Sequence, residues 1–126
     1  MTNNSNLLSF LGLMKKAGRL AVGDEPSYDA VRAGRARLII VASDASQNTV
    51  RRAQNYAQKT MDGYALLPVT KQELGNALGR ASCAFAAVCD AKFSKALMQK
   101  LPPDSVFQSS KKQGNIKFFQ GEREEI

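Results

Sequence analysis

The sequence predicts a single α/β domain in which helices cover both faces of a central sheet, a three-layer α/β/α sandwich. Two apolar runs, Leu38–Ala42 and Cys83–Val88, lack the polar alternation of a half-exposed strand, which indicates strands buried on both faces. Segments with helical spacing flank both runs, so helix and strand alternate along the chain. A length of 126 residues and a hydrophobic content of 44% fit one domain. We expect the two runs to lie on adjacent strands, with Leu38–Ala42 at the centre.

The first third of the chain predicts two helices joined by a short extended link. Apolar residues recur at helical spacing over Leu7–Met14, and Gly18 ends this helix. Arg19–Val22 is a short apolar link that is compatible with a strand. The acidic pair and proline of Asp24–Pro26 are typical of a helix start. Gly34 closes this second helix, whose inner side we expect to carry Tyr28, Val31 and Ala33.

The remainder of the domain repeats the same alternation. Gln47–Thr60 has the apolar spacing of a helix, and Tyr64–Val69 is a further short apolar strand. Thr70–Leu78 begins with a capping-box pattern, in which a Thr hydroxyl and a Glu carboxylate satisfy free amides reciprocally. Asp90–Leu101 is a last helix with an acidic cap, and the two prolines that follow terminate it.

The chain divides into a domain over residues 6–101 and a polar tail over residues 102–126. Within the tail, Val106-Phe107 and Ile116–Phe119 flank the turn-like Gln113-Gly114-Asn115. Both a disordered tail and a small hairpin packed on the domain are compatible with this pattern.

The charge of the chain favours an anionic partner. Eighteen Lys and Arg against eleven Asp and Glu give a formal net charge of +7. Residues 1–101 hold fourteen basic and seven acidic residues, while residues 102–126 hold four of each. The excess of positive charge therefore belongs to the domain and not to the tail.

The residues argue for binding and against catalysis. The chain has no histidine, so the commonest general base and transition-metal ligand are missing. Cys83 and Cys89 are too far apart in a strand to pair with each other, and two distant thiols do not form a usual zinc site. No phosphate-binding glycine motif is present. Asp44 is expected to cap or order a loop. We therefore predict no enzyme activity, no cofactor and no metal.

The chain carries no recognisable leader or membrane-spanning segment. No signal peptide opens it, and no apolar run approaches the ~18 residues needed to span a bilayer. We expect a cytoplasmic monomer without membrane contact.

Several short motifs resemble one known superfamily in order along residues 6–101. They are Leu11-Gly12-Leu13 with Lys15-Lys16-Ala17-Gly18, then Gly23, then Arg37–Ser46 with Asn48-Thr49, then Thr70–Gly75 and Gly79. Together they resemble the kink-turn RNA-binding ribosomal proteins, and most closely the small bacterial YlxQ-like branch. The resemblance implies the three-layer α/β fold and a partner that is structured RNA.

The resemblance also implies which residues meet RNA. In that superfamily the amino end of the second helix and two neighbouring loops grip a kink-turn, a sharply bent RNA element with sheared G·A pairs. By position, residues 23–27 would face the G·A pairs, Ser46 and Val50 would flank a flipped base, and Lys71 would meet phosphate. Residues 80–85 would pack against extruded bases. The implied RNA-binding residues are Gly23, Asp24, Glu25, Ser27, Ser46, Val50, Lys71, Arg80, Ala81, Ser82 and Ala84.

This sequence departs from the superfamily at the second helix. The usual Asn-Glu pair followed three residues later by Lys is replaced by Glu25-Pro26 and Asp29, and acidic residues repel phosphate. Either the protein grips RNA more through its backbone and basic side chains, or its RNA is not a standard kink-turn. The basic candidates are Lys71, Arg80, Arg51 and Arg52.

The predicted function is non-catalytic binding of structured RNA, kink-turn-like, in a ribosome-associated role. The alternative is a protein-interaction module on the same fold, docking through residues 25–29, with RNA binding weakened or lost. A third hypothesis, the RNA-substrate domain of a ribose methyltransferase, is disfavoured because no knotted cofactor-binding domain follows in the chain.

Overall fold

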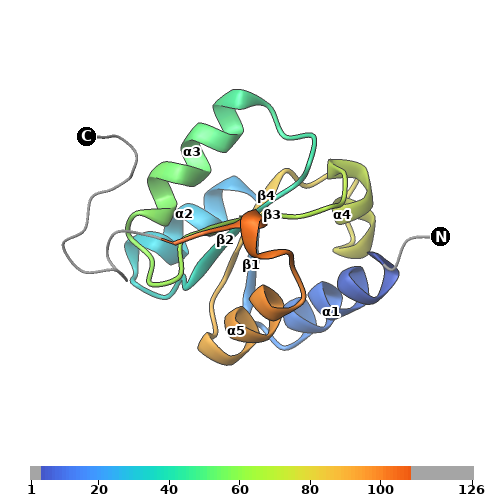
Figure 1. Ribbon diagram of the computed structural model, residues 1–126, viewed down its shortest axis with the longest axis horizontal. Coiled ribbons are helices and arrows are strands. Elements are labelled where there is room, and N and C mark those ends of the chain that lie inside the picture. The colour runs from blue at the N-terminus through green and yellow to red at the C-terminus, as the bar shows by residue number, and fades with distance from the viewer. Residues whose placement is uncertain (1–3, 109–126) are drawn as a thin grey trace.

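A computed structural model describes residues 4–108 of the chain, in which helices and strands alternate (Figure 1). The helices are α1 (Asn4–Lys16), α2 (Asp24–Arg32), α3 (Gln47–Ala57), α4 (Lys71–Ala77), α5 (Ala91–Gln99) and the 3-10 turn η1 (Pro103–Ser105). The strands are β1 (Leu20–Val22), β2 (Leu38–Val41), β3 (Tyr64–Leu66), β4 (Phe85–Val88) and β5 (Val106–Phe107). The predicted order of elements is confirmed for these residues.

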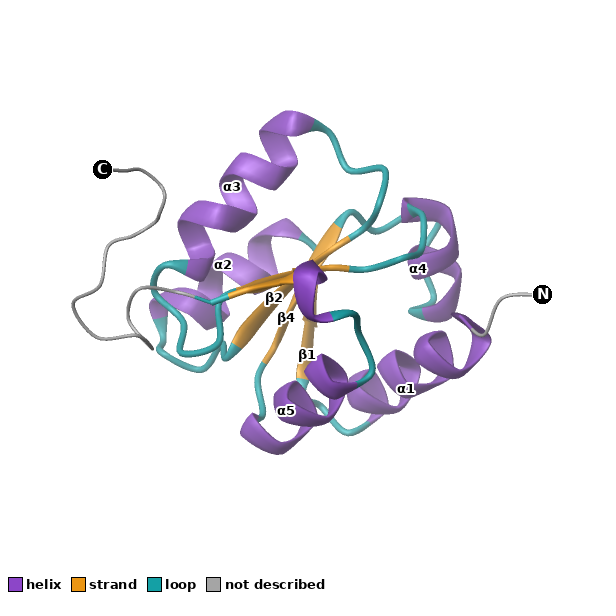
Figure 2. Ribbon diagram, viewed as in Figure 1, coloured by secondary structure: helices purple, strands orange, loops and turns teal. Residues whose placement is uncertain are grey.

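The strands form one mixed sheet in the order β1-β4-β2-β3-β5 (Figure 2). β2 pairs in parallel with β3 and antiparallel with β4, so the strand predicted as central lies in the middle of the sheet. All four residues of β2 and all four of β4 are buried. The prediction that the two apolar runs without polar alternation lie on adjacent strands is therefore confirmed.

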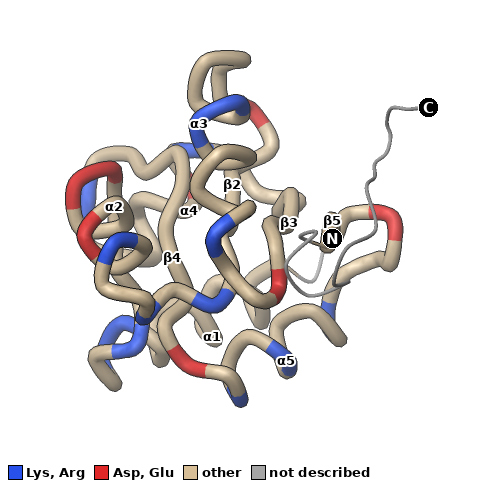
Figure 3. Tube along the Cα trace, turned by 90° about the vertical axis from the view of Figure 1, so that its left-hand side faces the viewer, with Lys and Arg blue, Asp and Glu red and all other residues tan. Residues whose placement is uncertain are grey.

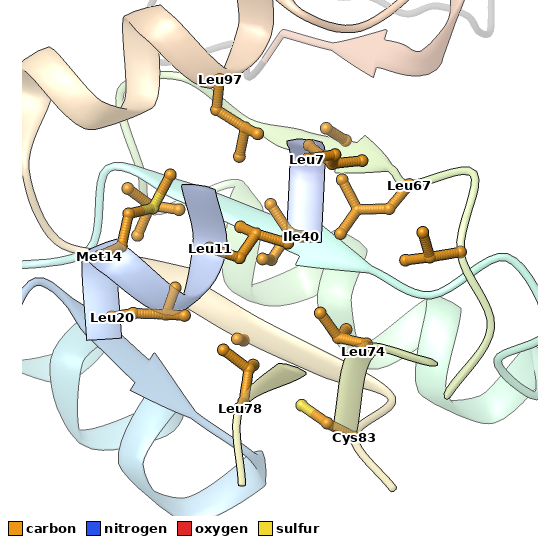
Figure 4. Packing of buried hydrophobic residues seen from close by; sticks show 14 of the residues in the cluster. Leu7, Leu11, Met14, Leu20, Ile40, Leu67, Leu74, Leu78, Cys83 and Leu97 are labelled. Carbon is orange, nitrogen blue, oxygen red and sulfur yellow. The ribbon is translucent and has the colours of Figure 1, made fainter. Parts of the chain in front are cut away.

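Helices cover both faces of this sheet. One core cluster joins α1, α4 and α5 to one face, and Figure 4 shows Leu11 and Leu67 directed toward Ile40 of β2. The other cluster joins α2 and α3 to the opposite face through Ile39 and Val41, the alternate residues of the same strand. The three-layer α/β/α sandwich expected from the sequence is confirmed.

Side-chain caps begin three helices as their sequences predict. The Ser46 hydroxyl accepts a hydrogen bond from the Thr49 N–H (3.2 Å), and Asp90 accepts one from the Phe93 N–H (3.0 Å). Thr70 and Glu73 form both halves of the capping box. These bonds satisfy amides that the first helical turn leaves unpaired.

The inner face of α2 differs from the expected one. Val31 is buried as expected, but Tyr28 is 46% exposed and Ala33 is also exposed. The face that meets the sheet instead carries Ser27 and Ala30, both fully buried. Tyr28 lies toward α3 instead, where its ring packs beside Tyr56 with centroids 5.8 Å apart.

The sheet continues past the predicted domain boundary. Val106–Phe107 pairs with β3 as an edge strand, and the Phe107 ring stacks on Tyr64 with centroids 4.7 Å apart. The part of the predicted hairpin at 113–119 lies outside the described residues. Among residues 4–108, no helix is both long and apolar enough to cross a membrane.

Candidate nucleic-acid interface

One edge of the sheet gathers the loops that the sequence singled out. Val22 pairs with Ala86 and Val41 pairs with both Phe85 and Leu66, so three strands end and β4 begins at this edge. Four segments follow or precede these strand ends. They are residues 23–25, 42–46, 67–71 and 79–84, which we call the rim.

Hydrogen bonds between backbone segments hold the rim loops together. The Asp44 carboxylate accepts a bond from the Lys71 N–H (2.7 Å), and the Lys71 carbonyl accepts one from the Cys83 N–H (3.0 Å). The Ala42 N–H donates to the Ala84 carbonyl (2.8 Å). Asp44 thus has the loop-ordering role that its position predicted. Because these bonds tie residues 42–46, 67–71 and 79–84 to one another, these three segments of the rim form a preformed surface.

Helix α4 fixes the loop at 79–84. The Arg80 N–H donates to the Gly75 carbonyl (2.8 Å), and the Lys15 ammonium of α1 donates to the Leu78 carbonyl at the end of α4 (2.8 Å). The loop passes so close to Gly75 that a side chain there would meet the backbone of Ser82. Ala81 and Ser82 are exposed at the outer side of this loop.

Two basic side chains of the rim have no acidic partner. Neither Lys71 nor Arg80 forms an ion pair within the described part of the chain, and Arg80 is exposed. One terminal nitrogen of Arg80 lies 3.5 Å from the position that a β carbon on Gly23 would take. The guanidinium of Arg80 therefore lies beside Gly23 at the start of α2.

The start of α2 presents backbone amides and two acidic side chains. Gly23 occupies the N-cap position with φ +94°, and no side chain caps the helix. Asp24 and Glu25 are exposed in the first turn, where negative charge is stabilised by the helix dipole. Ser27 is fully buried and donates to the Ala21 carbonyl (3.2 Å), so its hydroxyl does not reach the rim surface.

The start of α3 forms the far side of the rim. Ser46 is exposed, but its oxygen is engaged with Thr49 as the helix cap. Val50 is half-buried and packs on the cluster beneath α2 and α3. Ser46 thus belongs to the rim and Val50 follows it on α3. The Ser46 hydroxyl oxygen already accepts the Thr49 N–H.

An unpredicted contact joins α2 to α3. The Asp24 carboxylate accepts hydrogen bonds from Arg52 (2.5 Å) and from the Tyr56 hydroxyl (3.2 Å). Burial, and next the negative charge of Asp24, raise the pKa of Tyr56. Arg52, which the sequence suggested as a phosphate ligand, is therefore already paired with the Asp24 carboxylate. Only the four-residue spacing of Arg52 and Tyr56 on one helix face signals this contact in the sequence.

Charge is distributed unevenly around the rim. Figure 3 shows acidic stretches on α2 and a basic stretch on α3. Asp29 lies 3.9 Å from Arg32, an exposed pair one turn apart. Asp24 is paired as well, so Glu25 is the acidic side chain of α2 that has no ion-pair partner among residues 4–108.

The Cys83 thiol, in the rim segment 79–84, is buried in the hydrophobic core. Burial raises the pKa of Cys83, and the nearby positive charge of Arg80 opposes that shift only in part. Its thiol donates to the Phe85 carbonyl (3.4 Å). Within residues 4–108, no three His, Cys, Asp or Glu side chains come together as metal ligands.

The match to known proteins covers the region that builds the rim. Residues 5–98 match the Ribosomal protein L7Ae/L30e/S12e/Gadd45 family. The chain belongs to this family. The family resemblance identified from short motifs is thereby confirmed, and the matched range of the L7Ae/L30e/S12e/Gadd45 family contains every rim residue named above.

Two bacterial relatives are each named RNA-binding protein YlxQ. The relative from Bacillus subtilis (strain 168) is 28% identical over 95 residues, which cover 72% of this chain and 90% of that protein. The relative from Enterococcus faecium is 32% identical over 53 residues, covering 42% of this chain and 52% of that protein. The second match thus spans about half the length of that relative.

Solved structures share the fold. A protein of unknown function from Bacillus halodurans C aligns with a TM-score of 0.65 and 32% identity, covering 73% of this chain and 92% of the other. The Giardia lamblia 15.5kD RNA binding protein aligns with a TM-score of 0.58 and 17% identity, covering 74% and 79%. At that identity the second likeness concerns the fold alone.

Proposed function

We propose that this chain binds structured RNA through the rim, without catalysing a reaction. The observation that carries the proposal is the pair Lys71 and Arg80, two cations without acidic partners on loops that are tied together by hydrogen bonds. The net charge of +7 favours the same class of partner. Relatives named RNA-binding protein YlxQ support it further.

Each part of the rim has a chemistry suited to RNA. Lys71 and Arg80 can neutralise phosphates, and this neutralisation supplies affinity that depends on salt. Free amides at the start of α2, beside Gly23, can donate to phosphate oxygens. Ala81, Ser82 and Ala84 are small residues against which unstacked bases can pack. The rim therefore combines positioning by phosphate contacts with contacts to bases.

The finer part of the proposal is that the RNA contains a kink-turn-like element and that the protein acts on the ribosome, in the cytoplasm and as a monomer. A sharp bend brings two backbone stretches close together, which suits a rim with cations on two separate loops. The acidic start of α2 weakens recognition less than its sequence suggests, because Arg52 already neutralises Asp24. The repulsion that remains centres on Glu25.

An affinity titration tests this function. The protein is titrated against a kink-turn RNA and against a scrambled duplex of equal length, at several salt concentrations. We expect tighter binding to the kink-turn, with log affinity falling linearly as log salt rises. Equal affinity for both RNAs would remove the kink-turn from the proposal. Absence of binding to either RNA would overturn RNA binding altogether.

The same titration decides on a second candidate, docking of a protein partner through α2. This candidate is favoured by the unpaired Glu25 and the exposed Tyr28 on neighbouring turns of that helix. Protein docking becomes the better explanation if neither RNA binds and the protein is folded, as judged by cooperative thermal unfolding.

A further inference from the structure

Three aromatic rings pack in a row from the exposed face of α2 to the start of β4, next to the rim. The Tyr28 and Tyr56 ring centroids are 5.8 Å apart, and the Tyr56 and Phe85 centroids are also 5.8 Å apart. Tyr28 is 46% exposed, whereas Phe85 is buried at the start of β4, where its carbonyl accepts a bond from the Gly23 N–H. The exposed ring is therefore connected through one intermediate ring to the rim.

The rings lie in a seam between two helices. On α2, Asp24, Tyr28 and Arg32 follow each other at four-residue spacing and share one face. On α3, Arg52 and Tyr56 have the same spacing. These five residues form what we call the α2–α3 seam, and Figure 1 shows the two helices on the same side of the sheet.

The exposed end of the seam pairs an aromatic ring with a guanidinium. The central carbon of Arg32 lies 5.5 Å from the centroid of the Tyr28 ring. An aromatic face and a guanidinium plane are the two surfaces on which unpaired RNA bases stack. Both lie here on one helix, one turn apart. The guanidinium lies over the ring in the free protein, so a base that stacks on this face of Tyr28 takes the place of Arg32.

The seam is held rigid next to this exposed end. The Tyr56 hydroxyl and Arg52 both bind the Asp24 carboxylate, so the second ring and the start of α2 are fixed relative to each other. Tyr28 packs against the Tyr56 ring that is fixed in this way, with centroids 5.8 Å apart. A ring that is held in place before binding loses less conformational entropy when a base stacks on it.

We propose that the α2–α3 seam binds one or two unpaired nucleotides that adjoin the structured RNA element on the rim, with a base stacked on Tyr28. This inference rests on the proposed function and extends its surface from the rim along α2. Asp24 belongs to the rim and binds Arg52 and Tyr56 of the seam, and this continuity favours RNA over a separate protein partner. Arg32 stacks on the same base or contacts its phosphate.

Three RNAs and four proteins test the seam. One RNA is a blunt-ended kink-turn duplex, and the other two each carry two unpaired adenosines, one RNA at one end and one at the other. The proteins are the parent, Tyr28→Ala, Tyr28→Phe and Leu13→Ala, a control with a 54% exposed side chain on α1, which covers the opposite face of the sheet. Affinity is measured for every pair.

We expect the parent to bind one of the extended RNAs more tightly than the blunt RNA. Tyr28→Ala should lose this gain. Its affinity for the extended RNA should fall by roughly 5- to 100-fold, the range for one base stacked on an aromatic side chain. The same variant should bind the blunt RNA as the parent does. Tyr28→Phe should keep the gain, because it keeps the ring, and Leu13→Ala should behave as the parent. A 2-aminopurine in the extension should lose fluorescence on binding the parent but not Tyr28→Ala.

Three results would overturn the inference. If the parent binds blunt and extended RNAs equally, the rim function stands and the seam is free for a protein partner. If Tyr28→Ala weakens binding to blunt and extended RNAs equally, the ring supports the fold and not a base. If the parent binds none of the three RNAs, the seam proposal falls together with the proposed function.

Discussion

The α carbon of Ser82 lies only 2.5 Å from the position that a β carbon on Gly75 would occupy. The nitrogen and carbonyl carbon of Ser82 both lie 2.7 Å from the same position. Helix α4 and the rim loop are therefore in direct backbone contact. Since the Gly75 carbonyl also accepts the Arg80 N–H, helix α4 fixes the backbone of the loop that carries Arg80.

The close approach predicts that Gly75→Ala damages both stability and binding. The added methyl must push the backbone of Ser82 away, and overpacking of this kind typically costs about 1–3 kcal/mol of unfolding free energy. Displacement of Arg80 should also weaken affinity for a kink-turn RNA. Thermal unfolding and an RNA titration measure the two effects.

A glycine in α1 provides the matched control. A β carbon on Gly12 would meet the Ala77 carbonyl oxygen at 3.5 Å, an ordinary contact. Gly12→Ala should therefore be neutral or stabilising by up to ~1 kcal/mol, because alanine restricts the unfolded chain. Equal unfolding midpoints for Gly75→Ala and Gly12→Ala would show that the loop at 79–84 moves without loss of stability and that Gly75 does not position it.

Local chemistry explains why helix starts were predictable. Ser46, Thr70 and Asp90 each accept a bond from an amide three residues later, so the whole interaction is contained in four residues of sequence. The buried strands were equally accessible, because absence of alternation depends only on neighbouring residues.

Contacts between distant segments explain what the sequence did not predict. Asp24 meets Arg52 and Tyr56, which are 28 and 32 residues away, and no local pattern selects those partners. The antiparallel pairing of β1 with β4 is likewise a long-range contact, whereas the adjacency of β2 and β4 was expected from their apolar runs.

The exposed face of α2 was missed for a different reason. A helical pattern identifies large apolar residues as inward-facing, and Tyr28 satisfied it. Tyr28 instead lies toward α3, where its ring packs beside Tyr56, while Ser27 takes the buried position and its hydroxyl donates to the Ala21 carbonyl.

The central strand makes a direct prediction for stability. Ile40 is fully buried on β2, between two neighbouring strands and beneath α1. Ile40→Ala should lower the free energy of unfolding by ~2–5 kcal/mol, because the variant buries less apolar surface and leaves a cavity. Denaturant titration measures the change, with exposed Leu13→Ala as the control. An unchanged midpoint would contradict a central position for this strand.

The two unpaired cations make a prediction for RNA binding. Replacing Lys71 and Arg80 together with alanine should weaken binding to a kink-turn RNA. The slope of log affinity against log salt should fall by up to about 1 for each phosphate that the variant no longer neutralises. The control replaces Lys59 and Lys92, which are exposed at the opposite edge of the sheet, and removes the same charge. If both double variants bind alike, net charge and not the rim carries the affinity.

The Asp24–Tyr56 hydrogen bond makes a prediction for alkaline pH. A raised pKa means that the folded state favours the protonated phenol, so this contribution to stability is complete below the ordinary tyrosine pKa of about 10. It is lost as the pH rises through the folded-state pKa. Tyr56→Phe cannot ionise, so its midpoint should fall less than the parent's between about pH 9 and pH 12, a range that brackets the ordinary tyrosine pKa. Parallel midpoint curves over that range would contradict the assigned shift.

The departure at α2 can be tested by restoring the superfamily pattern. Glu25 has no ion-pair partner among residues 4–108 and is the main source of repulsion toward phosphate, while Asp29 is offset in part by the exposed Arg32 at 3.9 Å. Glu25 lies in the first turn of α2, whose amides would otherwise attract phosphate, and Asp29 lies in the second turn. Glu25→Asn with Asp29→Lys should therefore tighten binding to a kink-turn RNA by on the order of 1–3 kcal/mol, the range for regained base and phosphate contacts.

A control must add the same charge elsewhere, because the double change raises net charge by three. Lysines at three exposed positions on the opposite edge of the sheet do so, through Ala33→Lys, Gln58→Lys and Ala91→Lys. Added charge alone should improve binding to the kink-turn and to a plain duplex to a similar degree. The restored pattern should instead favour the kink-turn, because asparagine and lysine at the start of α2 would meet features that only the bent element presents. A double variant that gains no more than the charge control would remove α2 from the RNA surface and move the protein-docking hypothesis ahead.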